Sequence, residues 1–359
     1  MKLFLIGGFL GSGKTTAIKE AAEALLQQGR KVGVVTNDQG VDLVDTEYLN
    51  SFGIPTAQVT NGCFCCNYDL LVESINTLIY KNQPELIFAE SVGSCTDLVA
   101  TIAKPLYRFM SDLQVVITVF VDASLLCSLV NGSASFLNDD VRYIYKKQIE
   151  EADVLIFNKM DLLSPDEVTL VKETISKQHE TKTILYQDSL QSADIEHWLH
   201  ILNNFHISGT RHSLDIDYEI YASGEAMLAW YDAVVTIRSS TNRAYSEALQ
   251  LTRLIERSIR ESGHVIGHLK FLINDNGNFE KISHTTISSR PVGQTDDRRN
   301  STNVELLINA RVQASPSTLN QIIETAFTTI ESHSRTIVDI HNVSSFQPGY
   351  PRPTHRIAN

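Results

Sequence analysis

Residues 8–15 read Gly-Phe-Leu-Gly-Ser-Gly-Lys-Thr, directly after the apolar run 3–6 and directly before a segment of helical periodicity, residues 16–28. A Gly-x4-Gly-Lys-Thr run between a strand and a helix is typical of a phosphate-binding loop. Its glycines let backbone N–H groups turn toward an anion, and the helix start adds its positive dipole end. We expect Lys14 to reach the β- and γ-phosphates and Thr15 to ligate Mg²⁺. The sequence therefore predicts binding of a nucleoside triphosphate, with contacts from Gly8, Gly11, Ser12, Gly13, Lys14, Thr15 and Thr16.

The base is indicated by Asn158-Lys159-Met160-Asp161, which follows the buried-strand pattern 154–157. Open α/β sheets bind ligands at the carboxyl ends of their strands. The Asp161 carboxylate can accept hydrogen bonds from guanine N1–H and from the exocyclic amine, and adenine lacks this donor pair. A buried polar mismatch of this kind discriminates by roughly 10⁴ or more. We expect Asn158 to hold the loop and contact the base, and the Lys159 stem to pack along it, so the predicted nucleotide is GTP.

Two further strand ends carry residues expected near the phosphates. Residues 86–89 predict a buried strand that ends in Glu90-Ser91-Val92-Gly93. A carboxylate there can hold the water shell of Mg²⁺, and a glycine lets a backbone N–H approach the γ-phosphate. Asp38 follows the strand pattern 32–35 and either lies near the metal or forms a turn, because Asn-Asp-x-Gly is favourable turn chemistry. Gly93 is thus a candidate nucleotide contact, and the candidate catalytic residues are Lys14, Glu90 and Asp38.

Three of the five cysteines fall within Asn61-Gly62-Cys63-Phe64-Cys65-Cys66-Asn67. Thiolates are soft ligands that suit Zn²⁺ or Cu(I), and a Cys-x-Cys-Cys segment supplies three of them to one ion only if the backbone turns tightly. A tetrahedral site needs a fourth ligand, for which a histidine, a carboxylate or a water qualifies. The alternatives are buried inert cysteines or a redox pair. We expect Cys63, Cys65 and Cys66 to bind a transition metal, and the isolated Cys95 and Cys127 to pack.

The order of these motifs, with a strand ending Val121-Asp122-Ala123 between Glu-Ser-x-Gly and Asn-Lys-x-Asp, resembles the CobW-like branch of the CobW/HypB/UreG P-loop GTPases over about residues 1–205. The resemblance implies a slow GTPase that hands a metal ion to a client metalloprotein or cobalamin enzyme, with the cysteines coupled to the nucleotide state. Family members commonly carry Glu-Asn-Glu-Phe-Gly-Glu after the second strand, whereas residues 36–42 here read Thr-Asn-Asp-Gln-Gly-Val-Asp. This departure leaves the other ligands open, and the metal open between Zn²⁺ and another transition metal such as Co²⁺.

Composition limits the classes of partner. The 359 residues suffice for two domains that each bury a core. A net charge of −12 without a basic block argues against a nucleic-acid or anionic-membrane surface. No apolar run approaches the roughly 18 residues of a membrane span, and the first strand leads straight into the phosphate loop, so we expect no signal peptide. Clustered cysteines in odd number indicate a reducing compartment. We therefore expect a cytoplasmic protein, and whether it forms a homodimer is left open.

The predicted fold class is α/β, followed by a small α+β domain. Alternating strands and helices predict a P-loop GTPase domain over residues 1–207, with a mostly parallel sheet wrapped by helices. Its remaining elements are expected at strands 114–121 and 183–186 and helices 68–81, 140–151, 165–178 and 193–203. Residues 208–230 are expected to connect the domains. Residues 231–343 predict a β-α-β-β-β-α-β series of ferredoxin-like type, with an Asn-Asp-Asn-Gly hairpin at 274–277, and residues 344–359 an extended tail.

Three functions compete at this point. The first is a GTP-hydrolysing metallochaperone or metallocentre assembly factor. The second is a GTP-dependent conformational partner of a cobalamin enzyme, in which the cysteines stabilise the fold and transfer no metal. The third is a small-molecule kinase, which needs a substrate carboxylate or an arginine lid and leaves the Asn-Lys-x-Asp motif and the cysteines without a role.

Overall fold

The computed structural model describes residues 1–40, 44–132, 138–179, 181–206, 211–287, 299–333 and 335–359. They form two compact units. The first comprises Met1–Gln39, Phe52–Gly224 and Tyr350–Asn359, and the second Gly40–Ser51 and Glu225–Gly349. These units divide the chain differently from the expected boundaries, because the segment after the second strand and the C-terminal tail each join the unit that is remote in sequence. Residue 207 of the expected GTPase domain and residues 208–210 of the expected connection lie outside the described residues.

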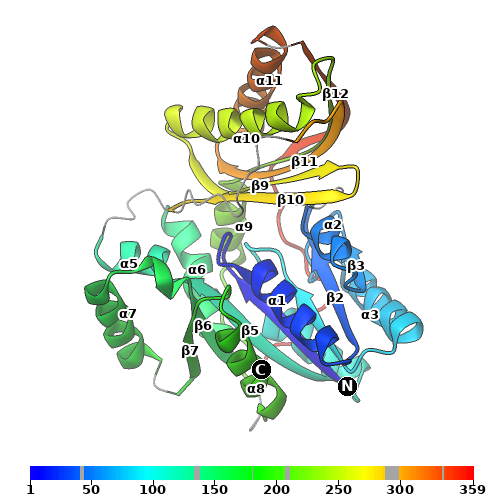
Figure 1. Cartoon of the computed structure of the whole chain (residues 1–359). Coiled ribbons are helices and arrows are strands. Elements are labelled where there is room, and N and C mark those ends of the chain that lie inside the picture. The colour runs from blue at the N-terminus through cyan, green and yellow to red at the C-terminus, as the bar shows by residue number, and fades with distance from the viewer. Residues whose placement is uncertain (41–43, 133–137, 180, 207–210, 288–298, 334) are drawn as a thin grey trace. The chain divides into compact units, whose positions relative to one another are not determined.

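The first unit is built on a seven-stranded parallel sheet of order β3-β2-β4-β1-β5-β6-β7 (Figure 1). Every residue of the central strand, β1, is buried except its first, although successive side chains point to opposite faces of the sheet. Both faces are therefore covered by helices, as parallel sheets require. The strands are β1 (Lys2–Gly8), β2 (Val32–Asn37), β3 (Thr56–Val59), β4 (Leu86–Glu90), β5 (Gln114–Asp122), β6 (Val154–Asn158) and β7 (Thr183–Gln187).

The helices of this unit follow the apolar periodicity of the sequence where they are long. The predicted ones form as α1 (Lys14–Gln27), α3 (Tyr68–Asn82), α6 (Asp139–Glu151), α7 (Pro165–Gln178) and α8 (Ser192–Asn204). Ser164 begins α7 with a capping box to Glu167. The sequence pattern missed β3 and the shorter helices, which carry too few residues for a periodicity to show: a π-helix (Val99–Ala103), α4 (Lys104–Phe109), α5 (Ala123–Val130) and α9 (Tyr218–Ala226).

The second unit is a five-stranded antiparallel sheet of order β10-β9-β11-β8-β12. The elements appear in the predicted β-α-β-β-β-α-β series, and β9-β11-β8-β12 has the ferredoxin-like strand order with β10 added at the edge. Asn276 and Gly277 have φ of 52° and 89°, which confirms the predicted hairpin turn. Its elements are β8 (Ala229–Ser239), α10 (Ala244–Glu261), β9 (Val265–Asp275), β10 (Asn278–Thr285), β11 (Asn303–Gln313), α11 (Pro316–His333) and β12 (Thr336–Phe346).

A short helix from the N-terminal part of the sequence also belongs to this second unit. α10 and α11 bury their apolar stripes on one face of the antiparallel sheet, and α2 (Val44–Ser51) packs through Val44 against Leu272 and Leu307. Asp45 of α2 is paired with Lys270 and Lys281. Burial alone would raise the pKa of Asp45, but the two ammonium groups outweigh it and lower that pKa. None of the helices described is long and apolar enough to cross a membrane.

Candidate functional site

The phosphate loop lies between β1 and α1, in the context that the sequence predicted. Two of its glycines are required by their surroundings. Gly8 has a φ of 127°, and a Cβ on it would lie 2.1 Å from the Phe120 carbonyl oxygen of β5. Gly13 has a φ of 92°, and a Cβ there would lie 2.3 Å from Asn158 Nδ2. Any side chain at either position would be strained and would clash with a neighbouring strand or loop, so both positions require glycine.

The polar side chains expected at the phosphates and at Mg²⁺ lie together. Lys14 is buried, and its Nζ donates to the carbonyl oxygens of Gly8 (2.7 Å) and Phe9 (3.2 Å). The Thr15 hydroxyl donates to Glu90 Oε1 at 2.9 Å. A hydroxyl and a carboxylate in contact form the hard oxygen pair that suits Mg²⁺. The structure therefore brings together residues that are 75 positions apart in the sequence.

Asn158 connects the guanine motif to the phosphate loop. Its Nδ2 donates to the Ser12 carbonyl oxygen at 2.9 Å, and its Oδ1 accepts from the Ser189 backbone N (3.0 Å) and hydroxyl (2.8 Å). Lys159 has a φ of 64°, and its Nζ lies 2.6 Å from Asp122 Oδ2. Asp161 is exposed. The sequence reasoning did not include Ser189, although it follows the last parallel strand at the carboxyl end, where a polar residue after an apolar run is a signal.

The two remaining candidates have different surroundings. A Cβ on Gly93 would lie 2.6 Å from Leu10 Cδ2 and 3.0 Å from the Leu10 backbone N, so Gly93 lies against the phosphate loop. Asp38 lies directly after β2, and its Oδ1 accepts from the Gln39 backbone N at 2.7 Å.

The cysteine loop (residues 61–67) lies between β3 and α3 and turns tightly. The backbone N–H groups of Cys66 and Asn67 both donate to the Cys63 carbonyl oxygen, at 3.1 and 3.0 Å. The Sγ atoms of Cys63 and Cys65 are 2.8 Å apart, and those of Cys65 and Cys66 are 3.8 Å apart. All three sulfurs lie within 4.8 Å of one another. The turn that three thiolates need in order to reach one ion is present.

The shape of this loop depends on residues remote in sequence. Asn37, at the end of β2, donates from Nδ2 to the carbonyl oxygens of Val59 (3.0 Å) and Gly62 (2.8 Å). Its Oδ1 accepts from the Phe64 backbone N at 2.8 Å, and the Phe64 ring is fully buried. A single amide therefore fixes both sides of the cysteine loop to the sheet. The sequence reasoning gave Asn37 no role, although its place at a strand end was a signal.

The C-terminal tail (residues 350–359) lies along the cysteine loop. The Arg352 backbone N donates to Cys66 Sγ at 3.3 Å. Thr354 donates from its backbone N to the Cys65 carbonyl oxygen (2.8 Å) and from Oγ1 to that of Cys66 (3.0 Å). Further along, Arg356 Nε donates to Oδ2 of the buried Asp97 at 2.7 Å. The tail thus contacts both the cysteine loop and the loop after β4.

The thiols differ in their readiness to lose a proton. The Cys65 thiol is a hydrogen-bond partner of Cys63 and holds the pKa of Cys63 well below its ordinary value. The hydrogen bond with Cys63, together with burial, raises the pKa of Cys65 well above its ordinary value and raises that of Cys66 to about 11. One thiolate stabilised by neighbouring thiols is the state from which a soft cation completes deprotonation of the rest.

Cys95 packs as expected, because it is buried, but it is not isolated from the other thiols. Its side chain is in hydrogen-bonding contact with those of Cys63 and Cys65. Cys95 is buried and lies five residues after Glu90 in the loop that follows β4. The sequence could not show this contact because it joins two loops about 30 positions apart.

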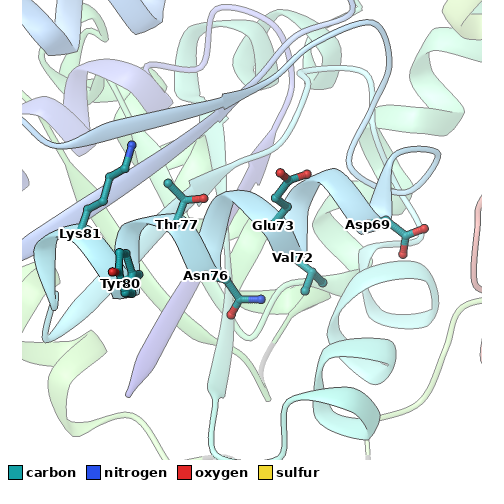
Figure 2. Close-up of a pocket in the computed structure, with 7 residues that line it drawn as sticks. All are labelled: Asp69, Val72, Glu73, Asn76, Thr77, Tyr80 and Lys81. Atoms are coloured by element: carbon teal, nitrogen blue, oxygen red, sulfur yellow. The ribbon is translucent and has the colours of Figure 1, made fainter.

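A shallow hollow lies elsewhere, on the outer face of α3. Figure 2 shows that its lining side chains all project from this one helix, and Tyr80 among them is 87% exposed. It is a helix surface rather than an enclosed site. The lining residues are Asp69, Val72, Glu73, Asn76, Thr77, Tyr80 and Lys81.

Comparison with known protein families agrees with this geometry. The model of the CobW/HypB/UreG nucleotide-binding domain matches residues 2–186, just over half of the 359 residues. The chain belongs to the CobW/HypB/UreG family. The matched range contains the phosphate loop, the cysteine loop and the guanine motif, whereas Ser189 and the C-terminal tail lie outside it.

Several curated members of the family are similar to this chain. Zinc chaperone CobW from Sinorhizobium sp is 27% identical over 207 residues, which cover 51% of this chain and 57% of that protein. Zinc chaperone YeiR from Escherichia coli is 30% identical over 165 residues, covering 45% and 47%. Zinc-regulated GTPase metalloprotein activator 1 from Schizosaccharomyces pombe is 27% identical over 184 residues, covering 48% and 42%. The chain spans about half the length of the curated relatives it matches.

Solved structures are more distant. The crystal structure of HypB from Helicobacter pylori in complex with nickel is 18% identical, with a TM-score of 0.43 over 58% of this chain and 91% of that chain. FtsY from Thermotoga maritima is 14% identical, with a TM-score of 0.40 over 56% of this chain and 67% of that chain. These similarities are too distant to transfer a function.

Proposed function

We propose that this protein is a GTP-hydrolysing metallochaperone that binds Zn²⁺, or a related transition metal, through Cys63, Cys65 and Cys66. The observation that carries the proposal is the gathering of three sulfurs within 4.8 Å in the same compact unit as a phosphate loop. Relatives named as zinc chaperones support Zn²⁺ as the cargo. A client metalloprotein would receive the ion when the nucleotide state lowers the affinity of the site.

On the nucleotide side, each residue has a proposed role that follows from its chemistry. Lys14 would exchange its two carbonyl partners for phosphate oxygens, because an ammonium–phosphate pair is a stronger, charge-assisted bond. Thr15 and Glu90 would hold Mg²⁺, which neutralises phosphate charge when bound. Asp161 would accept the guanine donors, with Asn158 fixing its loop to the phosphate loop. Glu90 and Asp38 are the carboxylates proposed to assist slow hydrolysis.

On the metal side, the cysteine loop supplies soft ligands in a dry setting. Cys63 and Cys65 are buried, so water competes weakly for the ion. The N–H group of Arg352 points at Cys66 Sγ, and such a donor stabilises a thiolate. Because binding needs deprotonated thiols, metal uptake should release protons.

The test compares zinc binding by the wild-type protein with that of a Cys65→Ser/Cys66→Ser double variant, using a chromophoric chelator as competitor. Cys127→Ser is the matched control, because Cys127 is also a buried thiol but lies on α5. We expect one Zn²⁺ per wild-type and control chain and loss of binding in the double variant, with phosphate release from GTP in all three. Unchanged zinc binding in the double variant would contradict the proposal.

A further inference from the structure

We propose that Cys95 is the fourth thiolate of the metal site and that it completes the site in the GTP state. This inference rests on the proposed function and adds to it a ligand and a direction of coupling. It starts from the side-chain hydrogen bonds of Cys95 with Cys63 and Cys65, which place a fourth thiol beside the three sulfurs that lie within 4.8 Å of one another.

The spacing of the sulfurs suits a tetrahedral ion that is one ligand short. With Zn–S bonds of about 2.3 Å, the sulfurs of a tetrahedral site lie roughly 3.8 Å from one another. Cys65 and Cys66 already have this separation, and Cys63 and Cys65 at 2.8 Å need to part by the difference of about 1 Å. Cys95 is not within 4.8 Å of all three sulfurs, since only Cys63, Cys65 and Cys66 share that mutual reach. A small movement of the loop that carries Cys95 would close the tetrahedron.

That loop is the one that nucleotide should control. Cys95 follows Glu90, the proposed Mg²⁺ ligand, and Gly93, which lies against Leu10 of the phosphate loop. The segment is short, and its turn is closed by the Cys95 backbone N donating to the Val92 carbonyl oxygen at 3.0 Å. A γ-phosphate that fixes Gly93 would therefore fix Cys95 two residues later.

The far side of the loop is held by α6, so that its movement is limited. Gln148 is buried and donates from Nε2 to the carbonyl oxygens of Gly93 (3.0 Å) and Cys95 (2.8 Å). Glu151, one turn later, accepts from the Thr96 hydroxyl at 3.1 Å and from the Leu98 backbone N at 2.6 Å. These contacts keep the Cys95 thiol directed at the cysteine loop and leave a short displacement as the available motion.

The functional consequence is a site with two affinities. Four thiolates make a closed site of the kind that holds structural zinc, whereas three thiolates leave a position open for water or a client ligand. Engagement of Cys95 in the GTP state would retain the ion, and its withdrawal after hydrolysis would release it. A coupling of about 1–3 kcal/mol, or roughly 5- to 150-fold in affinity, is typical of such linkage.

The test measures zinc affinity by chelator competition in GDP and in a non-hydrolysable GTP analogue, for the wild type, Cys95→Ser and the control Cys127→Ser. We expect the wild type and the control to bind Zn²⁺ roughly 5- to 150-fold more tightly with the analogue. In Cys95→Ser the GDP-state affinity should stay near that of the wild type, and the advantage of the analogue should disappear. If Cys95→Ser keeps the full difference, Cys95 is a packing residue and the inference is overturned.

A second measurement needs no variant and so does not depend on how Cys95→Ser folds. Co²⁺ bound to the wild type reports thiolates through sulfur-to-cobalt charge-transfer absorbance, which scales with their number. Passing from GDP to the analogue should raise this absorbance per cobalt by about a third, as three thiolates become four. Equal absorbance in the two states would overturn the fourth ligand while leaving a three-cysteine metallochaperone. Absence of metal binding by the wild type would instead defeat the proposed function itself.

Discussion

The phosphate loop and the cysteine loop are both short, glycine-containing turns between a strand and a helix, but they are built in different ways. In the phosphate loop, the groups proposed to bind phosphate are contiguous in the sequence, and Lys14 is held by the loop's own carbonyl oxygens. In the cysteine loop, the turn is fixed by Asn37, by the tail at Arg352 and Thr354, and by contact with Cys95. The phosphate loop has one side-chain hydrogen bond from a remote residue, Asn158 to the Ser12 carbonyl oxygen, whereas the cysteine loop is contacted by three other parts of the chain.

This difference suits two tasks. A cradle for phosphate serves best when it is rigid, because preformed donors need no reorganisation when the anion binds. A site that must give up its ion serves best when its geometry depends on elements that can move. The predictions below test whether the two loops respond separately, as this comparison requires.

The largest effect is expected at the phosphate loop itself. Lys14→Ala removes the fixed positive charge from a buried anion site, and we expect GTP affinity to fall by about 100-fold or more. Zinc affinity in the absence of nucleotide should stay unchanged, because the cysteine loop makes its own contacts. Nucleotide titration of the folded variant measures the GTP affinity, and chelator competition measures the zinc affinity.

The control for Lys14→Ala is Lys19→Ala on the same helix, because Lys19 pairs with Glu20 and Glu23 instead of loop carbonyls. It should bind GTP as the wild type does. Near-normal GTP affinity in Lys14→Ala would show that the loop is misassigned.

A smaller effect is expected from the amide that positions the cysteine loop. Asn37→Ala removes three hydrogen bonds, to Val59, Gly62 and Phe64, without touching a thiol. At about 1 kcal/mol of positioning energy per bond, zinc affinity should fall by about 10-fold or more. Asn76→Ala, at an exposed position on α3, is the matched control. Wild-type zinc affinity in Asn37→Ala would mean that the cysteine loop keeps its shape unaided, and the contrast with the phosphate loop would fail.

The remaining effect is on stability rather than on binding, and it concerns pH and the support of the Cys95 loop. Burial, followed by the charge of Asp97, raises the pKa of Glu151 to about 8. The pKa of a glutamate carboxyl in the unfolded chain is about 4.3. Because the folded-state pKa of Glu151 is higher, its protonated form stabilises the fold, fully so below about pH 4.3. This stabilisation is lost as the pH rises toward 8. In Glu151→Gln the amide can donate to Thr96 and accept from Leu98 at every pH. The variant should therefore gain about 3–4 kcal/mol over the wild type between pH 5 and pH 8.

Denaturant unfolding at pH 5 and pH 8 measures this gain. Glu150→Gln, whose carboxylate pairs with Lys147 nearer the surface, is the control and should show no such change. A wild-type free energy of unfolding that stays constant from pH 5 to pH 8 would show that Glu151 is already ionised.

The same contrast explains how far the sequence could be interpreted. The parallel sheet and the β-α-β-β-β-α-β series follow from local periodicity, and the structure confirms them. The structure also places residues 158–161 at the carboxyl end of β6, as strand-end chemistry predicted. What stayed hidden depends on contacts between distant segments. Asn37, Ser189 and Cys95 each act across a gap of about 25 residues or more. The membership of α2 in the second unit rests on Asp45 meeting lysines more than 200 positions later.

The central claim is that binding at the nucleotide site and binding at the metal site are thermodynamically coupled. Nucleotide affinity measured with and without Zn²⁺ tests this claim most directly. Linkage requires two factors to be equal. One is the factor by which Zn²⁺ raises the affinity for the non-hydrolysable GTP analogue relative to that for GDP. The other is the factor by which the affinity for Zn²⁺ is higher with the analogue bound than with GDP bound. We predict that saturating Zn²⁺ raises the ratio of analogue to GDP affinity by about 5- to 150-fold in the wild type. It should leave that ratio unchanged in Cys65→Ser/Cys66→Ser. An equal ratio with and without Zn²⁺ in the wild type would contradict the account.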